Sequence, residues 1–508
     1  MMEHKTKTNS KTVKENLSGR LEQKNLIFHT RLSLIAVILV LIILYLACAV
    51  NPVTQKRELM LLSRSDELAL GQQTDEEIIQ TYGLYEDKNL SDYIFSVGKK
   101  VAAVSHQSDL PYSFKVLDSP VVNAFAVPGG FIYLTRGILA YLNDEAELAG
   151  VIGHEVGHVT ARHSAQLYSR VIMAQLGLGL AGALSKNFER YAQLAEASLG
   201  LLFLSFSRDN ERQADDLGVL YSSRAGYDSR QMANLFITLE RLKPESGRDG
   251  LPSWLSTHPD PPDRIAAIKK AASSWQQANP GVAVKINRDE YLTNLDGLVF
   301  GEDPRQGFVE GKVFYHPGLR IQFPVPSGWK LNNTASRVQM ISPRENAVLV
   351  FSLAREKKAD EAAQNFVATN KVKVLGSEVK NLNGFTALRL EFELQAQETK
   401  ILGLVDFISH PEFVLVFMAY SDSVNYLPYL STFTASMNGL RLLTDPKKLN
   451  LKPERLRIIR VARRNTLAAI LQGLGLPENR LKEVSILNGL ELTESVEPGT
   501  LLKIPVRD

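Results

Sequence analysis

The sequence predicts a multidomain chain: a mainly α-helical domain with a small β-sheet, then an α+β domain, then a small module of the order strand, helix, helix, strand. Three observations predict it. The chain has 508 residues, more than one hydrophobic core usually serves. Helical and strand patterns alternate up to residue 300, whereas short alternating strands dominate residues 310–443. A separate strand and helix pattern follows a basic linker, over residues 455–507.

The overall composition is that of ordinary globular protein. Hydrophobic residues make up 44% and charged residues 22%, and the formal net charge is +3. A balance this close to neutrality gives no reason to expect a nucleic-acid partner.

The N-terminus departs from this average. Residues 1–31 carry seven Lys and Arg against three Glu, and residues 32–47 carry no charge. A basic region followed by a short apolar stretch suits a signal segment or a short anchor, with the basic side in the cytoplasm. We therefore expect the rest of the chain to be exported.

The only cysteine in the sequence, Cys48, ends this 32–48 segment, so no disulfide can form within one chain. Its position directly after Ala47 resembles a bacterial lipoprotein signal, in which the cysteine is acylated and becomes the mature N-terminus. The alternatives are an uncleaved signal anchor and an inert buried cysteine. Either of the first two predicts a membrane-tethered protein on the periplasmic face of the cell envelope.

The next elements lead to a histidine motif. Residues 123–127 and 131–134 read as strands around the turn Pro128-Gly129-Gly130. Asn143-Asp144-Glu145 then offers a cap and first-turn acids for a helix over 146–166, which carries HEVGH in its middle.

HEVGH places His154 and His158 four residues apart on one helix face, about 5–6 Å apart at Cβ, so both can bind one zinc ion. Glu155 is rotated by about 100° around the helix and can reach a zinc-bound water without ligating the metal. The zinc would lower the pKa of that water toward about 7, and Glu155 would take its proton as the water attacks a peptide carbonyl. Chance would produce the motif on the order of once in a hundred such chains. The motif therefore predicts a peptidase with one Zn²⁺ per subunit and polypeptide substrates.

A catalytic zinc needs a third protein ligand. The long metzincin arrangement is excluded because Ala161 and Ser164 stand where Gly and His are required. The helix FSRDNERQADDLG offers Glu211 and Asp215 on one face, where one can ligate and the other can accept a hydrogen bond from a ligand imidazole. Two such acids otherwise form a solvated face. His163 is one residue out of register, and we expect it to support a ligand or to lie at the surface.

Four segments in order, VNAFAVPGG, ELAGVIGHEVGHVTARHS, SFSRDNERQAD and STHPDPPDRI, resemble a family of zinc endopeptidases. It includes the membrane protease HtpX, the CaaX prenyl proteases and the periplasmic β-barrel assembly-enhancing protease. The resemblance covers about residues 60–270 and implies a zincin fold of the gluzincin type for residues 49–300. It also implies that Glu211 is the third zinc ligand and that Asp215 orients a ligand. Gln213 stands where the family usually has a second Glu.

The resemblance gives His258, in the HPDPPDR loop, a possible place at the metal. In relatives the corresponding histidine can approach the zinc and close its fourth position as a latch. The alternatives are stabilisation of the oxyanion, for which Arg208 and Arg264 are the other candidates, and a loop histidine shaped by the neighbouring prolines.

The strand after the glycine turn resembles the edge strand on which zinc peptidases bind substrate. We expect an extended peptide to pair with its backbone at Gly130, Phe131, Ile132 and Tyr133. The alternative is a plain core strand.

Residues 171–184 are short and rich in small residues and contain Gln175, which favours a buried or substrate-facing helix over a second membrane span. The following α+β domain, 310–443, loosely resembles small PsbP-like domains and is expected to have a largely antiparallel sheet. It shows no catalytic constellation, so we expect a scaffold or interaction role, with His316 and His410 as packed or surface residues.

Residues 455–507 resemble a LysM module through Thr466-Leu467, Asn488-Gly489 and Pro498-Gly499. Arg464-Asn465 replaces the Gly-Asp that the family usually has before Thr-Leu. Peptidoglycan binding and a degenerate packing module are both compatible with this pattern.

Together these features predict a zinc-dependent endopeptidase that cleaves unfolded or misassembled envelope proteins. The alternatives are a mostly latched protease that acts as an envelope assembly factor or holdase, and a peptidoglycan-binding protein.

Overall fold

The computed structural model describes residues 48–175, 205–243, 254, 257, 258, 263–396 and 399–507. The predicted basic region 1–31, residues 32–47 of the signal segment and most of the 171–184 helix lie outside these residues. The backbone of Cys48 begins strand β1 (Cys48–Val50), which pairs with β2 (Arg57–Leu59). In the described ranges, no helix has the length and apolar character needed to cross a membrane.

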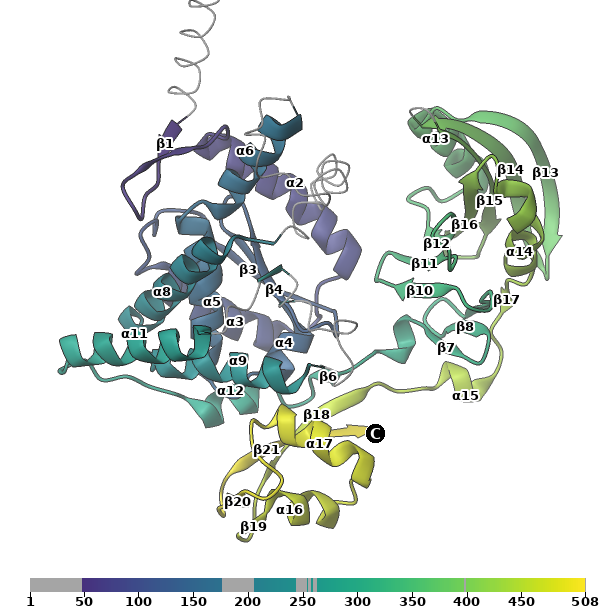
Figure 1. Ribbon diagram of the computed structural model, residues 1–508. Helices are drawn as coiled ribbons and strands as arrows, with labels where there is room; N and C mark the ends of the chain where they lie inside the picture. The colour runs from purple at the N-terminus through teal and green to yellow at the C-terminus, as the bar shows by residue number, and fades with distance from the viewer. Residues whose placement is uncertain are drawn as a thin grey trace, which may run out of the picture.

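The described chain is multidomain, with helices and several sheets. Figure 1 shows a helical body, a separate sheet-rich lobe and a small C-terminal module. The helical body holds a three-stranded sheet and nine helices that are named here: α2 (Arg64–Tyr82), α3 (Lys88–Ala102), α4 (Arg136–Tyr141), α5 (Glu145–Thr160), α6 (His163–Gln175), α8 (Arg208–Arg224), α9 (Met232–Arg241), α11 (Arg264–Ala278) and α12 (Arg288–Asn294).

The three-stranded sheet has the order β3 (Ser113–Leu117), β5 (Phe131–Thr135), β4 (Ala124–Val127). β5 runs parallel to β3 and antiparallel to β4, so both of its edges are occupied. The prediction that Gly130, Phe131, Ile132 and Tyr133 form a substrate-binding edge is therefore wrong. The sequence pattern shows the pairing of β4 with β5 across the glycine turn. It does not show the pairing of β5 with β3, because no turn connects these two strands directly.

Helix α5 lies in the centre of the helical body, and every one of its residues is buried. Close packing against α8 requires glycine at two positions on the shared face. A Cβ at Gly153 would lie 2.9 Å from the carbonyl oxygen of Gly218, and a Cβ at Gly157 would lie 3.2 Å from that of Ala214. The two helix backbones are thus in direct contact beside the histidine motif.

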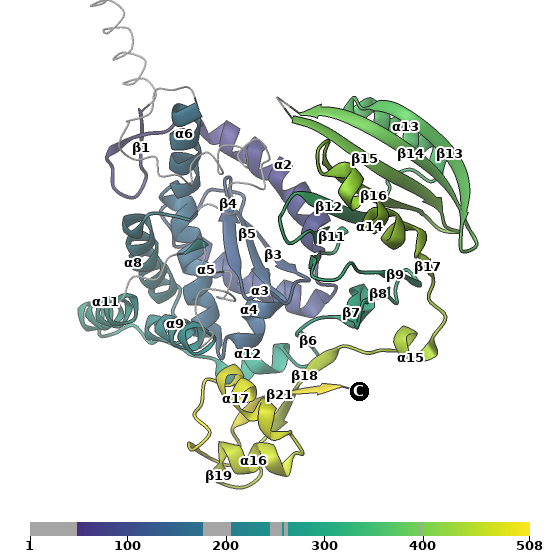
Figure 2. The same ribbon diagram turned by 45° about the vertical axis from the view of Figure 1, so that its right-hand side comes forward.

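The second lobe is built on a seven-stranded sheet whose pairs are all antiparallel, as the strand pattern predicted. Its order is β10 (Lys330–Asn333), β11 (Arg337–Ile341), β12 (Ala347–Leu353), β16 (Val414–Asp422), β15 (Thr399–Ser409), β14 (Phe385–Ala396), β13 (Lys373–Leu382). Helices α13 (Ala359–Asn370) and α14 (Tyr426–Asn438) pack in separate hydrophobic clusters on opposite faces of this sheet (Figure 2).

A smaller sheet lies beside it. Its order is β17 (Arg441–Leu442), β9 (Ile321–Pro324), β8 (Val313–His316), β7 (Phe308–Glu310). Helix α15 (Pro446–Leu449) follows β17 and leads to the C-terminal module.

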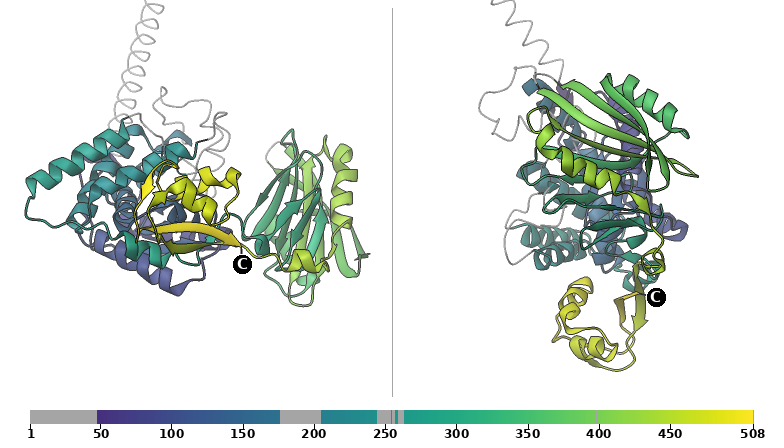
Figure 3. Two further views of the ribbon diagram at one scale, coloured as in Figure 1. Left: turned by 90° about the horizontal axis from the view of Figure 1, so that it is seen from below. Right: turned by 90° about the vertical axis from the view of Figure 1, so that its right-hand side faces the viewer.

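The C-terminal module has the predicted order of strand, helix, helix and strand. It consists of β18 (Glu454–Arg460), α16 (Leu467–Gly473), α17 (Glu478–Leu487) and β21 (Leu501–Arg507). β18 pairs with β21 and also with β6 (Val299–Phe300) of the helical body. The module is therefore joined to the helical body by a shared sheet, and Figure 3 shows it at one end of that body.

Candidate metal centre

Helix α5 carries the histidine motif into the core. Its N-cap, Asp144, lies in the predicted capping segment 143–145 and accepts a hydrogen bond from the backbone N–H of Glu147 at 2.7 Å. The prediction of one helix over 146–166 is wrong at its end, because α5 stops at Thr160 and Arg162 has a φ of 58° before α6 begins. His154, Glu155 and His158 follow in the middle of the helix and are each at most 1% exposed.

Four side chains bring a potential ligand atom each to within 4.8 Å of one another: His154, His158, Glu211 and His258. The Nε2 atoms of His154 and His158 are 3.1 Å apart. Nδ1 of His258 lies 3.0 Å from Oε1 of Glu211 and 3.3 Å from Nε2 of His154. Two imidazoles and a carboxylate converging from α5 and α8 form a donor set that suits zinc.

Asp215 and Arg264 contact two of these four side chains, His154 and Glu211, and orient them. Oδ1 of Asp215 lies 3.0 Å from Nδ1 of His154. Arg264 donates to both carboxylate oxygens of Asp215, at 2.6 and 2.8 Å, and its Nη1 lies 3.2 Å from Oε2 of Glu211. A carboxylate on Nδ1–H fixes the tautomer that presents Nε2 to a metal. The guanidinium thus binds two carboxylates, and Arg208, the other arginine considered for the oxyanion, is exposed.

His163 contacts Nδ1 of His158, as Asp215 contacts Nδ1 of His154. It is 1% exposed. The alternative that His163 lies at the surface is therefore wrong. Its Nδ1 lies 3.0 Å from Nδ1 of His158, and its Nε2 lies 2.9 Å from Oε1 of Gln213. An amide oxygen only accepts, so His163 donates from Nε2 and accepts at Nδ1 from His158. This leaves Nε2 of His158 free of a proton and directed toward Glu211. No pattern in the sequence predicts this role of Gln213.

The electrostatics favour the protonation states that a metal needs. Burial, followed by the neighbouring His154 and His163, lowers the pKa of His158 well below its usual value, which keeps the imidazole neutral. Burial acts to raise the pKa of Glu211, but His258, His154 and Arg264 outweigh it and lower that pKa. Glu211 is therefore ionised.

Glu155 is buried without a hydrogen bond to either carboxylate oxygen from the described residues. Its Oε1 lies 3.7 Å from Nε2 of His258. Burial raises its pKa, as expected of a carboxylate that takes up a proton near neutral pH. Two open carboxylate oxygens beside the four donors fit a base that acts on a metal-bound water.

Aromatic rings close the site on two sides. Phe206 stacks on His158 with ring centroids 4.1 Å apart, and Trp254 meets the edge of His154 at 5.7 Å. His258 is tied to Trp254 through a backbone hydrogen bond of 2.8 Å. Among the described residues, no strand pairs with the outer edge of β4, the strand of the small sheet that contacts α5 most.

The family model described as Peptidase family M48 matches residues 89–272. The mitochondrial metalloendopeptidase OMA1 of Schizosaccharomyces pombe is 32% identical over 43% of this chain and 65% of its own length. The beta-barrel assembly-enhancing protease of Escherichia coli is 29% identical over 47% of this chain and 49% of its own length. The chain thus spans less than two thirds of the curated relatives it matches. The cyanobacterial PsbP structure from Synechocystis covers 27% of the chain at 16% identity and a TM-score of 0.22, so the PsbP-like assignment stays a prediction.

Proposed function

We propose, on the premise that residues 89–272 are a metallopeptidase domain of peptidase family M48, that the chain is a zinc-dependent endopeptidase acting on polypeptides of the cell envelope. The convergence of four buried donor side chains beside the open carboxylate of Glu155 carries this proposal. The metalloendopeptidase relatives support the activity.

In this proposal His154, His158 and Glu211 hold the zinc, which when bound supplies a polarised water and a Lewis acid for the peptide carbonyl. Glu155 takes the proton from the water and passes it to the leaving amine. Asp215 and His163 keep the two imidazoles in the tautomer that presents Nε2.

We assign His258 the role of a latch. Its Nδ1 lies among the other donor atoms, so it is placed to take the fourth position and exclude water. Opening then requires the His258 side chain to leave this position. This arrangement favours the second candidate function, a mostly closed protease that binds envelope proteins as an assembly factor or holdase.

For substrate binding we propose the outer edge of β4. An extended peptide added there would run beside α5, and backbone hydrogen bonds give affinity with little demand on sequence. Acylation of Cys48, a periplasmic location and peptidoglycan binding by residues 455–507 belong to the same proposal and stay predictions.

The test measures zinc content and casein cleavage together. Glu155→Gln should keep its zinc and lose activity on the order of a hundredfold or more. Glu211→Ala should lose both. Full zinc occupancy with full activity in Glu211→Ala would overturn the ligand assignment.

His258→Ala separates the roles of that residue. A latch predicts faster casein cleavage at unchanged zinc content. A fall of about a hundredfold or more would instead assign His258 to the oxyanion. Holdase function would be favoured if Glu155→Gln supported envelope integrity as well as the wild-type protein does.

A further inference from the structure

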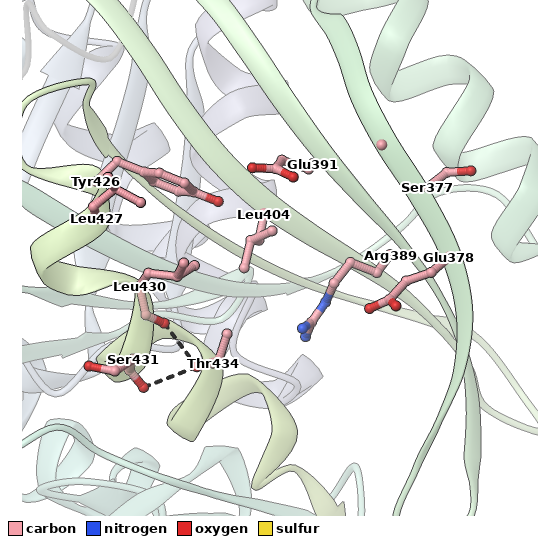
Figure 4. Close-up of a pocket in the computed structure, with 11 residues that line it drawn as sticks. Ser377, Glu378, Arg389, Glu391, Leu404, Tyr426, Leu427, Leu430, Ser431 and Thr434 are labelled. Atoms are coloured by element: carbon pink, nitrogen blue, oxygen red, sulfur yellow. Dashed lines mark hydrogen bonds between the residues drawn. The ribbon is translucent and has the colours of Figure 1, made fainter.

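The sheet-rich lobe contains a pocket of about 780 Å³ that the peptidase site does not use. It lies between α14 and the strands β13, β14 and β15 (Figure 4). Its lining includes Gly376 and Glu378 of β13, Arg389 and Glu391 of β14, Leu404 of β15 and Tyr426 of α14. A volume of this size accommodates several residues of a peptide.

Strand register explains the floor of the pocket. Gly376, Glu391 and Leu404 are paired neighbours on three adjacent strands. Because Gly376 has no side chain, space remains over it, and a Cβ there would lie 3.9 Å from Oε2 of Glu391. Glu391 is exposed to this space.

The charge of the pocket is negative. Arg389 is neutralised by Asp406, with hydrogen bonds of 2.5 Å from Nε and from Nη2 to the two carboxylate oxygens. Glu378 is partly balanced by Lys380 at 3.4 Å. Within the described ranges, no Lys or Arg forms an ion pair with Glu391. A cationic group is therefore the complementary ligand.

A buried hydroxyl points into the same space. Tyr426 is 3% exposed, and its hydroxyl makes no hydrogen bond of good geometry to the described residues. The Glu391 carboxylate acts on this hydroxyl and, after burial, is the next cause that raises its pKa. Figure 4 shows this hydroxyl directed from α14 toward the side on which Glu391 and Leu404 lie. An unsatisfied buried polar group is costly, and a ligand with a polar head would satisfy it.

Beside the hydroxyls of Ser377, Ser431 and Thr434, the lining holds three leucines, Leu404, Leu427 and Leu430. They suit the aliphatic stem of a lysine or arginine, whose charged end would reach Glu391. β13 is the last strand of its sheet, so an extended chain could also run along its outer edge.

We propose that this pocket binds a basic side chain of an extended polypeptide. The ammonium or guanidinium pairs with Glu391 and donates to the Tyr426 hydroxyl oxygen, while the stem lies on the three leucines. The site is separate from the metal centre and does not depend on the proposed peptidase activity.

Binding is tested on the full chain carrying Glu155→Gln, so that the probes stay intact. The probes are acetyl-Leu-Lys-Leu-amide and the same peptide with norleucine in place of lysine, measured by titration calorimetry at low salt. The lysine peptide should bind at least about tenfold more tightly, and added salt should reduce the difference.

Variants locate the site. Glu391→Gln should remove most of the preference for lysine, and Tyr426→Phe should reduce it. Glu361→Gln, on α13 at the opposite face of the sheet, is the matched control and should change nothing. Equal binding of the two peptides, an unaltered preference in Glu391→Gln, or no binding at millimolar concentration would overturn the proposal. Equally tight binding of free cadaverine would show a site for small amines and would also refute it.

Discussion

The ammonium of Lys503 donates a hydrogen bond of 2.7 Å to the carbonyl oxygen of Leu142, a residue 361 positions away. It also donates to the carbonyl of Ala140 at 2.6 Å. Lys503 is fully buried, and burial together with Arg288 lowers its pKa well below the usual value, while Glu147 acts in the opposite direction. The C-terminal module thus supplies the partner of two carbonyls at the C-terminal end of α4, just before the helix that carries the histidine motif.

Replacing Lys503 with Met should destabilise the protein by about 3 kcal/mol, because two buried carbonyls lose their hydrogen-bond donor. Calorimetric unfolding measures the loss. Lys452→Met, at an exposed lysine before β18, is the control. Equal stability of the two variants would show that the buried ammonium contributes nothing.

Gly153→Ala should cost about 1–3 kcal/mol, because its Cβ would lie 2.9 Å from the backbone oxygen of Gly218 and α5 and α8 would have to separate. The same shift should weaken zinc binding, since the two helices each carry proposed ligands. Gly473→Ala, in a helix with open space around the added methyl, should be neutral or slightly stabilising. Unfolding and zinc titration read out both effects, and unchanged zinc affinity would contradict the expected helix shift.

His163→Ala should lower zinc affinity by about 10- to 100-fold while leaving all three proposed ligands in place. The reason is the loss of the acceptor for Nδ1–H of His158. Gln213→Leu should lower zinc affinity by a smaller factor. Gln213→Glu should keep the wild-type zinc affinity, because a carboxylate oxygen still accepts the hydrogen bond from Nε2 of His163. Competition with a chelator measures the affinities. Wild-type affinity in His163→Ala would remove the residue from the site.

His316 should make the sheet-rich lobe sensitive to acid. Burial lowers its pKa to about 4, whereas an unfolded histidine titrates near 6.5. The unfolded state therefore binds more protons between these values, and stability falls as pH falls from about 6.5 to 4, by up to roughly 3 kcal/mol.

His316→Asn keeps an acceptor for the N–H of Leu319 and should flatten this pH dependence. His410→Asn should alter it less, because His410 is far less buried. The measurement is unfolding of each variant at several pH values between 4 and 7. A slope unchanged by His316→Asn would refute the assignment.

The sequence predicted what depends on local geometry. His154 and His158 converge because residues four apart share a helix face, and Asp144 caps the helix because its side chain suits that position. Glu211 lies 53 residues beyond His158, and only the resemblance to known peptidases connected them. The edge-strand prediction failed at Phe131 because its parallel pairing with β3, on the far side of β5 from the hairpin partner β4, leaves no mark in a local pattern.

Other features give weaker local signals. Lys503 stands within the apolar run LLKIPV, where an alternating strand pattern suggests a solvated lysine. Its burial depends on carbonyls supplied by a different part of the chain. The hydroxyl of Tyr426 likewise faces a pocket that exists only once α14 has packed on the sheet.

The pairing of β6 with β18 means that residues 301–453 leave the helical body and return to neighbouring strands. Within this excursion β17 pairs with β9, and Lys448 forms an ion pair with Glu310. The fold of residues 301–453 therefore brings the two ends of this segment together.

The contact between the two ends of residues 301–453 affects the order in which the domains assemble. Closing a flexible loop of that length costs entropy that grows with the logarithm of the number of residues. A lobe that folds first leaves only about fifteen residues to close, which lowers the closure cost by about 2 kcal/mol. Folding of the lobe would then speed the docking of the C-terminal strands, although the lobe contributes no ligand to the metal centre.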